Sequence, residues 1–289
     1  MPAVPADDSS RRNVTSPWNT RRLPVENANQ VQAQPSQVNP SPRVESQRPL
    51  GLGAAARVLL NMARGMRSDG DQASRLTAFY APQAQDYDAF RDRLLHGRQA
   101  LIDALLRHLP EDRAAHIVEL GAGTGRNLDF FGAALSDIGS VELVDICAPL
   151  LAIAHNRIAV SPWKDTCVLR TVHADVTRHV PAQAADCVYF SYSLSMIPSW
   201  ARAIDNALAM LRPGGIVGVV DFHLPEGGGI GNALWQRWFA HDGVYLSGEH
   251  LPFLRTHLTE LACTEARGAV PFLPGIRVPY YVFVGRKRS

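Results

Sequence analysis

The sequence predicts an α/β fold, with a doubly wound, mostly parallel seven-stranded sheet and an N-terminal helical cap. Short apolar runs alternate with amphipathic segments from residue 116 onward, a pattern typical of strands joined by crossover helices. A loop with three glycines directly follows the first apolar run, as in nucleotide-binding α/β folds. The last two apolar runs are joined by the turn sequence LPGI, which indicates an antiparallel hairpin at the end of the sheet.

The same periodicity places each element of the predicted sheet. Strands are expected at residues 116–120, 140–146, 167–174, 185–192, 215–222, 263–272 and 278–286. Helices are expected between them at about 125–135, 147–159 and 199–211.

The chain divides into three predicted parts. Residues 1–49 are rich in Pro, Gln, Asn, Ser and Arg and have few large apolar side chains. Such a segment cannot bury enough surface to offset its loss of entropy, so we expect a disordered tail. Residues 50–112 are predicted to form the N-terminal helices, and residues 113–289 the sheet domain.

Two stretches of the N-terminal part have helical periodicity. Residues 50–67 place apolar side chains on one face with arginines nearby, so this helix either lies on anionic lipid or packs against its own domain. Residues 75–109 indicate two helices, the second of which ends at Pro110. We expect these helices to cover the ligand site of the sheet domain.

Composition narrows the class of protein. Apolar residues make up 46% of the chain, enough for a sizeable core, and the net charge is +2. Residues 1–67 hold nine arginines against four acidic residues, which suggests an anionic surface near the N-terminal part. The four cysteines form no CxxC motif, so we expect reduced thiols and no metal site.

The glycine loop differs from the motifs that bind phosphate. Its sequence, GAGTGRN, contains Gly121, Gly123 and Gly125 but has no Lys after the last glycine, so it is not a phosphate-binding P-loop. Glu119 precedes the loop. Its carboxylate would repel a pyrophosphate and attract an ammonium or sulfonium group.

Two further acids follow the next two predicted strands. Asp145 is placed to meet ribose hydroxyls, and Asp175 to meet an adenine amino group. Each acid alone is also explained as a helix cap or a solvated turn residue. The ordered set indicates a cationic nucleoside without phosphate, and S-adenosylmethionine (AdoMet) is such a ligand. The predicted cofactor-binding residues are Glu119, Gly121, Gly123, Gly125, Asp145, Ile146, Asp175, Val176, Ser191 and Arg98.

From about His116 to the C-terminus the chain resembles the class I AdoMet-dependent methyltransferases, which have a Rossmann-like fold. The motifs that carry this resemblance are LGAGTGRN, VELVDI, HADVT, ADCVYFSYSLSMI and LRPGGIVGVVD. The flanking blocks YDAFRDRLLHGR and VPYYVFVGRK resemble the betaine-lipid synthesis methyltransferases of the diacylglyceryl-homoserine N-methyltransferase type. This second resemblance spans about residues 75–287.

The second resemblance implies an acceptor and a location. The acceptor would be the homoserine amine of diacylglyceryl-homoserine, methylated three times, by a chain that works beside the enzyme making that lipid. The protein would be cytoplasmic and peripheral at the inner face of a membrane, with no nucleic-acid partner. Two alternatives stay open: a methyltransferase for a small molecule or a quinone, and a non-catalytic AdoMet-binding regulator.

The catalytic candidates are predicted to position the substrates rather than to act as a single base. Tyr87 lies in a segment expected to cover the cofactor, and Tyr192 follows the fourth strand at the mouth of the cleft. His96 and Asp221 could each accept a proton, although lone histidines are more often structural and Asp221 is also explained as a capping residue. Arg98 could clamp a carboxylate of AdoMet or of the acceptor.

An aromatic group between strands five and six has two interpretations. Trp235, Trp238 and Phe239 recur at helical spacing. They indicate a helix that faces the core, or an apolar wall for acyl chains or a membrane.

Overall fold

The computed structural model describes residues 92–225, 232, 235–237, 239, 244–271 and 275–288. The predicted tail at 1–49, the predicted helix at 50–67 and the candidates Tyr87 and Trp238 lie outside the described residues.

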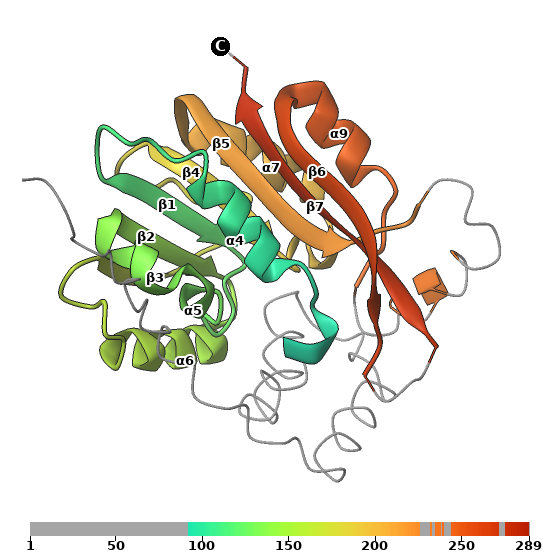
Figure 1. Ribbon diagram of the computed structural model, residues 1–289, viewed down its shortest axis with the longest axis horizontal. Coiled ribbons are helices and arrows are strands. Elements are labelled where there is room, and N and C mark those ends of the chain that lie inside the picture. Colours follow the sequence, from blue (N-terminus) through green and yellow to red (C-terminus); the bar gives the residue numbers. More distant parts are fainter. Residues whose placement is uncertain are drawn as a thin grey trace, which may run out of the picture. The chain divides into compact units, whose positions relative to one another are not determined.

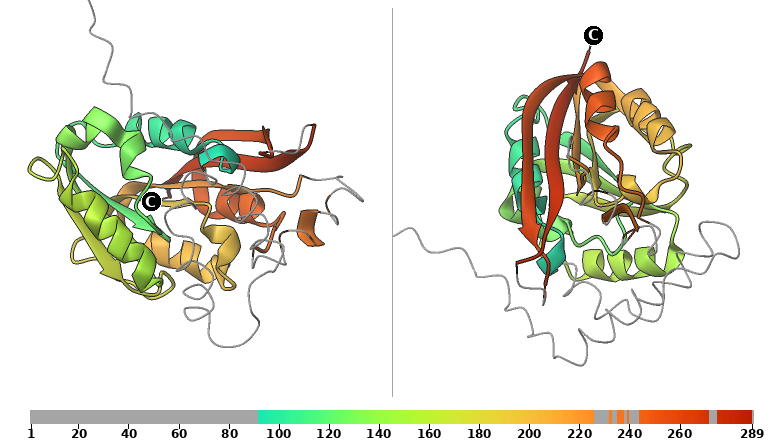
Figure 2. Two further views of the ribbon diagram at one scale, coloured as in Figure 1. Left: turned by 90° about the horizontal axis from the view of Figure 1, so that it is seen from below. Right: turned by 90° about the vertical axis from the view of Figure 1, so that its right-hand side faces the viewer.

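Seven strands form one sheet. They are β1 (Ala115–Leu120), β2 (Ile138–Asp145), β3 (Val168–His173), β4 (Ala185–Ser191), β5 (Leu211–Phe222), β6 (Leu258–Ala269) and β7 (Arg277–Lys287). Their order is β3-β2-β1-β4-β5-β7-β6 (Figure 1). The first five are parallel, and β7 is antiparallel to β5 and to β6. The predicted seven-stranded sheet and its terminal hairpin, which twists along one edge (Figure 2), are confirmed.

Helices cover both faces of the sheet, as a doubly wound fold requires. Residues of α4 (Arg98–Leu106), α5 (Leu128–Phe131) and α6 (Ala148–Ala159) share one apolar core with the sheet. Residues of α7 (Trp200–Met210) and α9 (His250–His257) share the other core. Figure 1 shows α4 in front of the sheet and α7 behind it. No helix in the described part of the chain has both the length and the apolar content to cross a bilayer.

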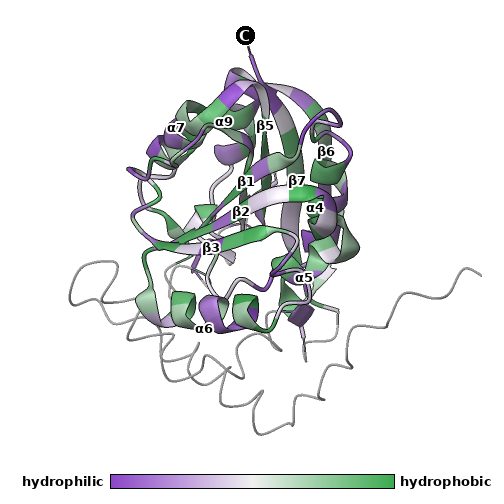
Figure 3. Ribbon diagram, turned by 90° about the vertical axis from the view of Figure 1, so that its left-hand side faces the viewer, coloured by the Kyte–Doolittle hydropathy of each residue, from purple (hydrophilic) through white to green (hydrophobic). Residues whose placement is uncertain are grey.

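α6 shows how the sequence selects a surface helix. It buries Leu150, Leu151 and Ala154 and exposes His155 and Asn156, so apolar side chains recur at helical spacing on one face. Figure 3 shows hydrophobic and hydrophilic residues alternating along this helix. α6 begins directly after Asp145 and Cys147, which places its first turn next to the end of β2.

α4 packs closely because β5 lacks a side chain at Gly218. A Cβ atom at Gly218 would lie 2.6 Å from Cδ2 of Leu105 and 3.0 Å from Cδ1 of Leu101, both fully buried. The glycine therefore allows α4 to approach the sheet backbone.

Three predicted elements differ from the structure. The helix expected at 125–135 is the short α5 followed by a 3₁₀ segment, η1 (Gly132–Asp137). The strand expected at 263–272 begins earlier, as β6, because it pairs with β7 along its whole length. The third is α9, which was not among the predicted helices; its Pro252 falls in the first turn, where proline is tolerated.

Candidate functional site

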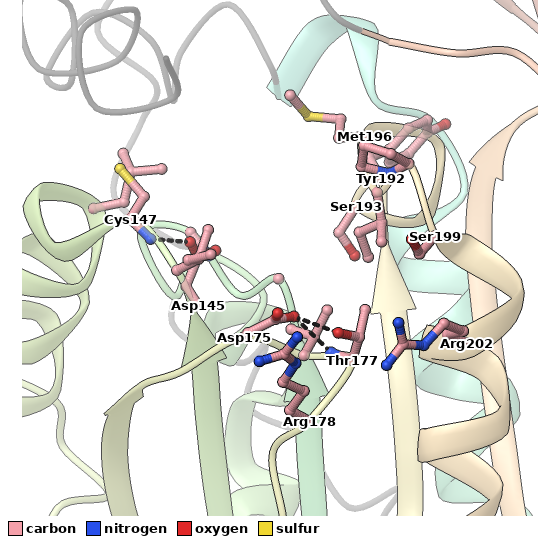
Figure 4. Close-up of a pocket in the computed structure, with 17 residues that line it drawn as sticks. Asp145, Cys147, Asp175, Thr177, Arg178, Tyr192, Ser193, Met196, Ser199 and Arg202 are labelled. Atoms are coloured by element: carbon pink, nitrogen blue, oxygen red, sulfur yellow. Dashed lines mark hydrogen bonds between the residues drawn. The ribbon is translucent and has the colours of Figure 1, made fainter. Parts of the chain in front are cut away.

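A cavity of about 250 Å³ opens at the carboxyl ends of the parallel strands. Figure 4 shows Asp145 and Cys147 on one wall, Tyr192, Ser193 and Met196 on the opposite wall, and Asp175 with Thr177 between them. Ligands of doubly wound sheets bind at this edge. The lining residues are Gly121, Gly123, Asp145, Ile146, Cys147, Leu150, Asp175, Val176, Thr177, Arg178, Tyr192, Ser193, Met196, Ile197, Pro198, Ser199 and Arg202.

The three predicted glycines all have left-handed backbone conformations, with φ of 77° at Gly121, 55° at Gly123 and 67° at Gly125. A Cβ at Gly121 would lie 2.4 Å from Cβ of Ser193, so this glycine lets the loop after β1 approach the loop after β4. Gly121 and Gly123 line the cavity, whereas Gly125 packs against Leu143 and α6.

Asp145 lines the cavity at the end of β2, as predicted for a ribose contact. Its Oδ2 accepts a hydrogen bond from the Gly123 amide and its Oδ1 one from the Cys147 amide, both at 2.8 Å. The carboxylate therefore links the glycine loop to the start of α6.

Asp175 lies at the base of the cavity, together with the predicted neighbour Val176. Its Oδ1 accepts hydrogen bonds from the backbone N–H and the hydroxyl of Thr177, each at 2.8 Å. Its Oδ2 has no hydrogen-bond partner among the described residues, so an acceptor is available where an adenine amino group was predicted. Ile146 lines the cavity as well.

Glu119 does not line the cavity, in contrast to its predicted direct contact with the ligand. It is fully buried; its Oε1 accepts a hydrogen bond from Asn127 Nδ2 at 2.5 Å and its Oε2 one from the Tyr189 hydroxyl at 2.7 Å. The pleat of β1 directs Glu119 to the face covered by α4 and α5, away from the mouth of the cleft.

Two buried polar atoms near Glu119 have no hydrogen-bond partner among the described residues: Asn127 Oδ1 and Ser191 Oγ. Ser191 lies on the same face as Tyr189, two residues further along β4, and Asn127 follows the glycine loop. Both residues are therefore close in the fold to lining residues of the cavity, Gly121 and Tyr192. Such orphaned buried atoms are costly and indicate a partner supplied by a ligand or water.

Tyr192 lines the cavity, as predicted, in a conformation that is rare for a residue other than glycine. Its φ is 53°, and its hydroxyl donates a hydrogen bond to the His96 carbonyl at 2.7 Å. Its ring meets Phe222 edge-on at 4.7 Å. Burial raises the pKa of this phenol well above its usual value, so Tyr192 stays neutral. Backbone strain of this kind is common at functional sites.

His96 and Arg98 have structural contacts in place of the predicted catalytic and clamping ones. The His96 ring bonds to the Ala269 carbonyl and occupies the space that a side chain at Gly268 would fill. Arg98 is buried and its Nη2 lies 2.6 Å from Oδ1 of Asp92. Neither side chain lines the cavity.

Asp221 is fully buried and is also absent from the cavity wall. Its carboxylate accepts hydrogen bonds from the backbone and hydroxyl of Ser195 and from the Phe222 amide. Asp221 therefore holds the loop after β4. This contact agrees with the interpretation of Asp221 as a capping residue. The predicted aromatic wall is likewise part of the core where it is described, because Phe239 is buried against Phe222.

The sequence prediction missed several residues of the site. Met196, Arg178 and Arg202 line the cavity. Met196 lies within the motif ADCVYFSYSLSMI but was not singled out, and Arg178 and Arg202 lie outside the motifs. Asn127, which is buried beside Glu119 but does not line the cavity, could have been noticed as the last residue of the loop, directly before α5.

The residues present fit AdoMet. Two carboxylates line the cavity, a glycine loop brings its backbone close, and the orphaned Asn127 Oδ1 is an acceptor of the kind that an α-ammonium group needs. Together the fold and this donor set define a class I AdoMet-binding domain.

The comparisons agree with this class. Residues 91–266 match the family described as "Methyltransferase domain". Because the match covers more than half of the chain, the chain belongs to the methyltransferase domain family, and AdoMet is its cofactor.

One curated relative is the ubiquinone/menaquinone biosynthesis C-methyltransferase UbiE of Saccharophagus degradans, which is 24% identical over 157 residues. The alignment covers 54% of this chain and 63% of that protein, so the chain spans less than two thirds of the length of this relative.

Two solved structures share the fold. The N-methyltransferase NodS from Bradyrhizobium japonicum WM9, in complex with S-adenosyl-L-homocysteine, has a TM-score of 0.55 at 15% identity, covering 76% of this chain and 100% of NodS. The cyclase SpnF has a TM-score of 0.52 at 18% identity, covering 81% of this chain and 92% of SpnF. At these identities the likeness concerns the fold alone.

Proposed function

We propose that the protein is an AdoMet-dependent methyltransferase whose acceptor is a small molecule with a quinone-type ring. The observation that carries the proposal is the similarity to UbiE over 157 residues. This similarity supports the quinone alternative better than the betaine-lipid acceptor expected from the flanking blocks.

The wall formed by the loop after β4 suits such an acceptor. Residues 192–199 contribute Tyr192, Met196, Ile197 and Pro198 to the cavity, and none of the eight residues carries a charge. Flat rings pack well against aromatic and sulfur-containing side chains. A zwitterionic homoserine head group would find no charged partner among residues 192–199; the charged residues Arg178 and Arg202 line the cavity outside this segment.

The chain's own residues would act by binding and orientation. Bound AdoMet supplies a methyl group on a positively charged sulfur; transfer to a ring carbon releases S-adenosylhomocysteine and one proton. Asp145 and Asp175 would hold the nucleoside, while the neutral Tyr192 would shape the acceptor side. Holding two reactants in line lowers the barrier by roughly 7–11 kcal/mol, so positioning can supply most of the catalysis.

The test compares two acceptors with the full chain and AdoMet. One is a water-soluble quinol that lacks the ring methyl group, and the other is diacylglyceryl-homoserine in anionic vesicles. We expect S-adenosylhomocysteine and a ring-methylated quinol, detected by mass spectrometry. Methylation of the lipid amine alone would replace the proposal with the betaine-lipid function. Binding of AdoMet without turnover on either acceptor would favour the regulator.

A further inference from the structure

A chain of alternating charges runs around the glycine loop. Asp92 joins two arginines: its Oδ1 lies 2.6 Å from Nη2 of Arg98, and its Oδ2 lies 2.9 Å from Nη2 of Arg126. Arg126 also pairs with Asp129, which accepts a further hydrogen bond from Arg157 at 3.0 Å. None of these five side chains is among the residues that line the cavity.

The network holds the glycine loop at two points. Arg126 belongs to the loop itself and donates two hydrogen bonds to Asp92 Oδ2, from Nε at 3.1 Å and from Nη2 at 2.9 Å. Arg157 reaches from α6 to the Thr124 carbonyl with its Nε at 3.1 Å. The ring of Phe130 lies under the guanidinium groups of Arg98 and Arg126, at 4.9 and 5.9 Å.

Asp92 is the member that connects this loop to the chain before α4. Its side chain is 11% exposed, and that of Arg98 is 6% exposed, so the pair is shielded from water. Burial alone would raise the pKa of Asp92, but hydrogen bonds from Arg126 and Arg98 outweigh it and the pKa is lowered. Asp92 is therefore ionised near neutral pH, and paired charges away from water interact strongly.

We infer that Asp92 is a positioning residue for the AdoMet-binding glycine loop, and that it couples cofactor binding to the packing of residues 92–97 against that loop. The inference rests on AdoMet as the cofactor and is independent of the identity of the methyl acceptor.

The physical reason is that the Asp92 carboxylate pairs both with Arg126 of the glycine loop and with Arg98 of α4. Without its charge, Arg98 and Arg126 would lose the carboxylate that they share, and the link that Asp92 makes between the glycine loop and the chain before α4 would be broken. A loop that is less ordered binds the cofactor less tightly. By reciprocity, cofactor binding must then strengthen the contact between the loop and residues 92–97 by the same factor.

The test uses the full chain and needs no methyl acceptor, so its outcome does not depend on whether the quinone proposal holds. Calorimetry measures S-adenosylhomocysteine affinity, and hydrogen exchange follows peptides within residues 92–106. For Asp92→Asn we expect affinity to fall about tenfold. We also expect the ligand to slow exchange in residues 92–106 of the wild type but not of the variant. Asp92→Glu, which keeps the charge, should recover part of both effects.

The matched control is Asp112→Asn, the same substitution in the exposed pair that Asp112 forms with Arg113 at 3.3 Å, and it should change neither readout. A folded Asp92→Asn protein that has a lower melting temperature but unchanged affinity would overturn the inference. If Asp92→Asn does not fold, Arg126→Lys keeps the charge but loses the two-nitrogen contact to Asp92. Unchanged affinity in that variant would equally overturn it.

Discussion

Asn127 and Glu119 form a buried hydrogen-bonded pair next to the glycine loop. Glu119 accepts a hydrogen bond from the Asn127 amide nitrogen, and a carboxylate can only accept. The amide nitrogen of Asn127 must therefore face Glu119, which leaves the Asn127 oxygen as the orphaned acceptor. The predicted role of Glu119 in binding a positive ligand stays a prediction; what the structure shows is that Glu119 orients the Asn127 amide.

The first prediction tests Asn127. Asn127→Ala should weaken S-adenosylhomocysteine binding by roughly 10- to 150-fold, because a hydrogen bond to a charged group contributes about 1.5–3 kcal/mol. Binding of 5′-methylthioadenosine, which lacks the amino-acid part, should stay the same. Calorimetry measures the affinity of wild type and variant for both ligands. An equal loss for both ligands would mean that Asn127 only supports the fold of the loop.

The second prediction concerns the pH dependence caused by Asp221. Burial raises its pKa to about 6 from a usual value of 3.8, so the folded protein binds this proton more tightly than the unfolded chain does. The free energy of unfolding from this group is therefore highest below pH 3.8 and falls as pH rises through 6, by roughly 3 kcal/mol. Asp221→Asn should remove that decrease.

Urea unfolding of the wild type and of Asp221→Asn between pH 4 and 7 checks this prediction. The quantity to compare is the difference between their free energies of unfolding at each pH. The difference is needed because His250 has the opposite slope: burial lowers its pKa to about 4, so its contribution is lost as pH falls from 6.5 to 4. Parallel pH curves for the two proteins would show that Asp221 has an ordinary pKa.

At the scale of the elements, α4 packs closely against β5. Among the described helices it comes nearest to a glycine of the sheet, Gly218. The third prediction is that Gly218→Ala lowers the free energy of unfolding by about 1–3 kcal/mol, because the added methyl group overpacks the core against Leu101 and Leu105. Chemical denaturation measures the change.

Two controls accompany this variant. Gly218→Ala combined with Leu105→Ala should be less destabilised than the sum of the two single variants, since the second change makes room for the first. Gly248→Ala, where the nearest atom would lie 3.4 Å away, should have little effect. If the changes in the free energy of unfolding caused by Gly218→Ala and Leu105→Ala simply added in the double variant, close packing at Gly218 would be contradicted.

At the scale of the whole molecule, the N-terminal part is the region in which membrane contact was predicted. The fourth prediction is that deletion of residues 1–67 leaves S-adenosylhomocysteine affinity intact but reduces binding to anionic vesicles. The reason is that each basic residue near an anionic surface contributes about 1 kcal/mol, and this segment has an excess of arginine.

Vesicle sedimentation and calorimetry on the full and shortened chains measure the two effects. Vesicle binding that persists after deletion would move the membrane contact to another segment. Full-length protein that ignores anionic vesicles would contradict the peripheral location and agree with a freely diffusing acceptor.

The fold itself permits more than one reaction. NodS is named as an N-methyltransferase and SpnF as a cyclase, and both share this architecture with the chain. The acceptor must therefore be argued from the wall of the cavity and from the similarity to UbiE, since fold alone does not determine chemistry.

Asp145 and Asp175 could be placed at the cavity from the sequence alone. Both follow apolar runs of parallel strands, and the carboxyl ends of such strands meet at one edge of the sheet. His96, Arg98 and Asp221 could not be placed in this way. Their partners are Ala269, Asp92 and Ser195, and a local pattern carries no information about contacts of this kind.

The sequence by itself determined the doubly wound sheet, its terminal hairpin and the cofactor class, because strand and helix periodicity and the glycine loop are local properties of the chain. Tertiary structure alone decided which of the other predicted polar side chains lie away from the cavity. The pleat of β1 buries Glu119 beside Asn127, and the close approach of Gly121 to Ser193 brings two loops together. These contacts join residues far apart in the sequence, so they exist only once the sheet has formed.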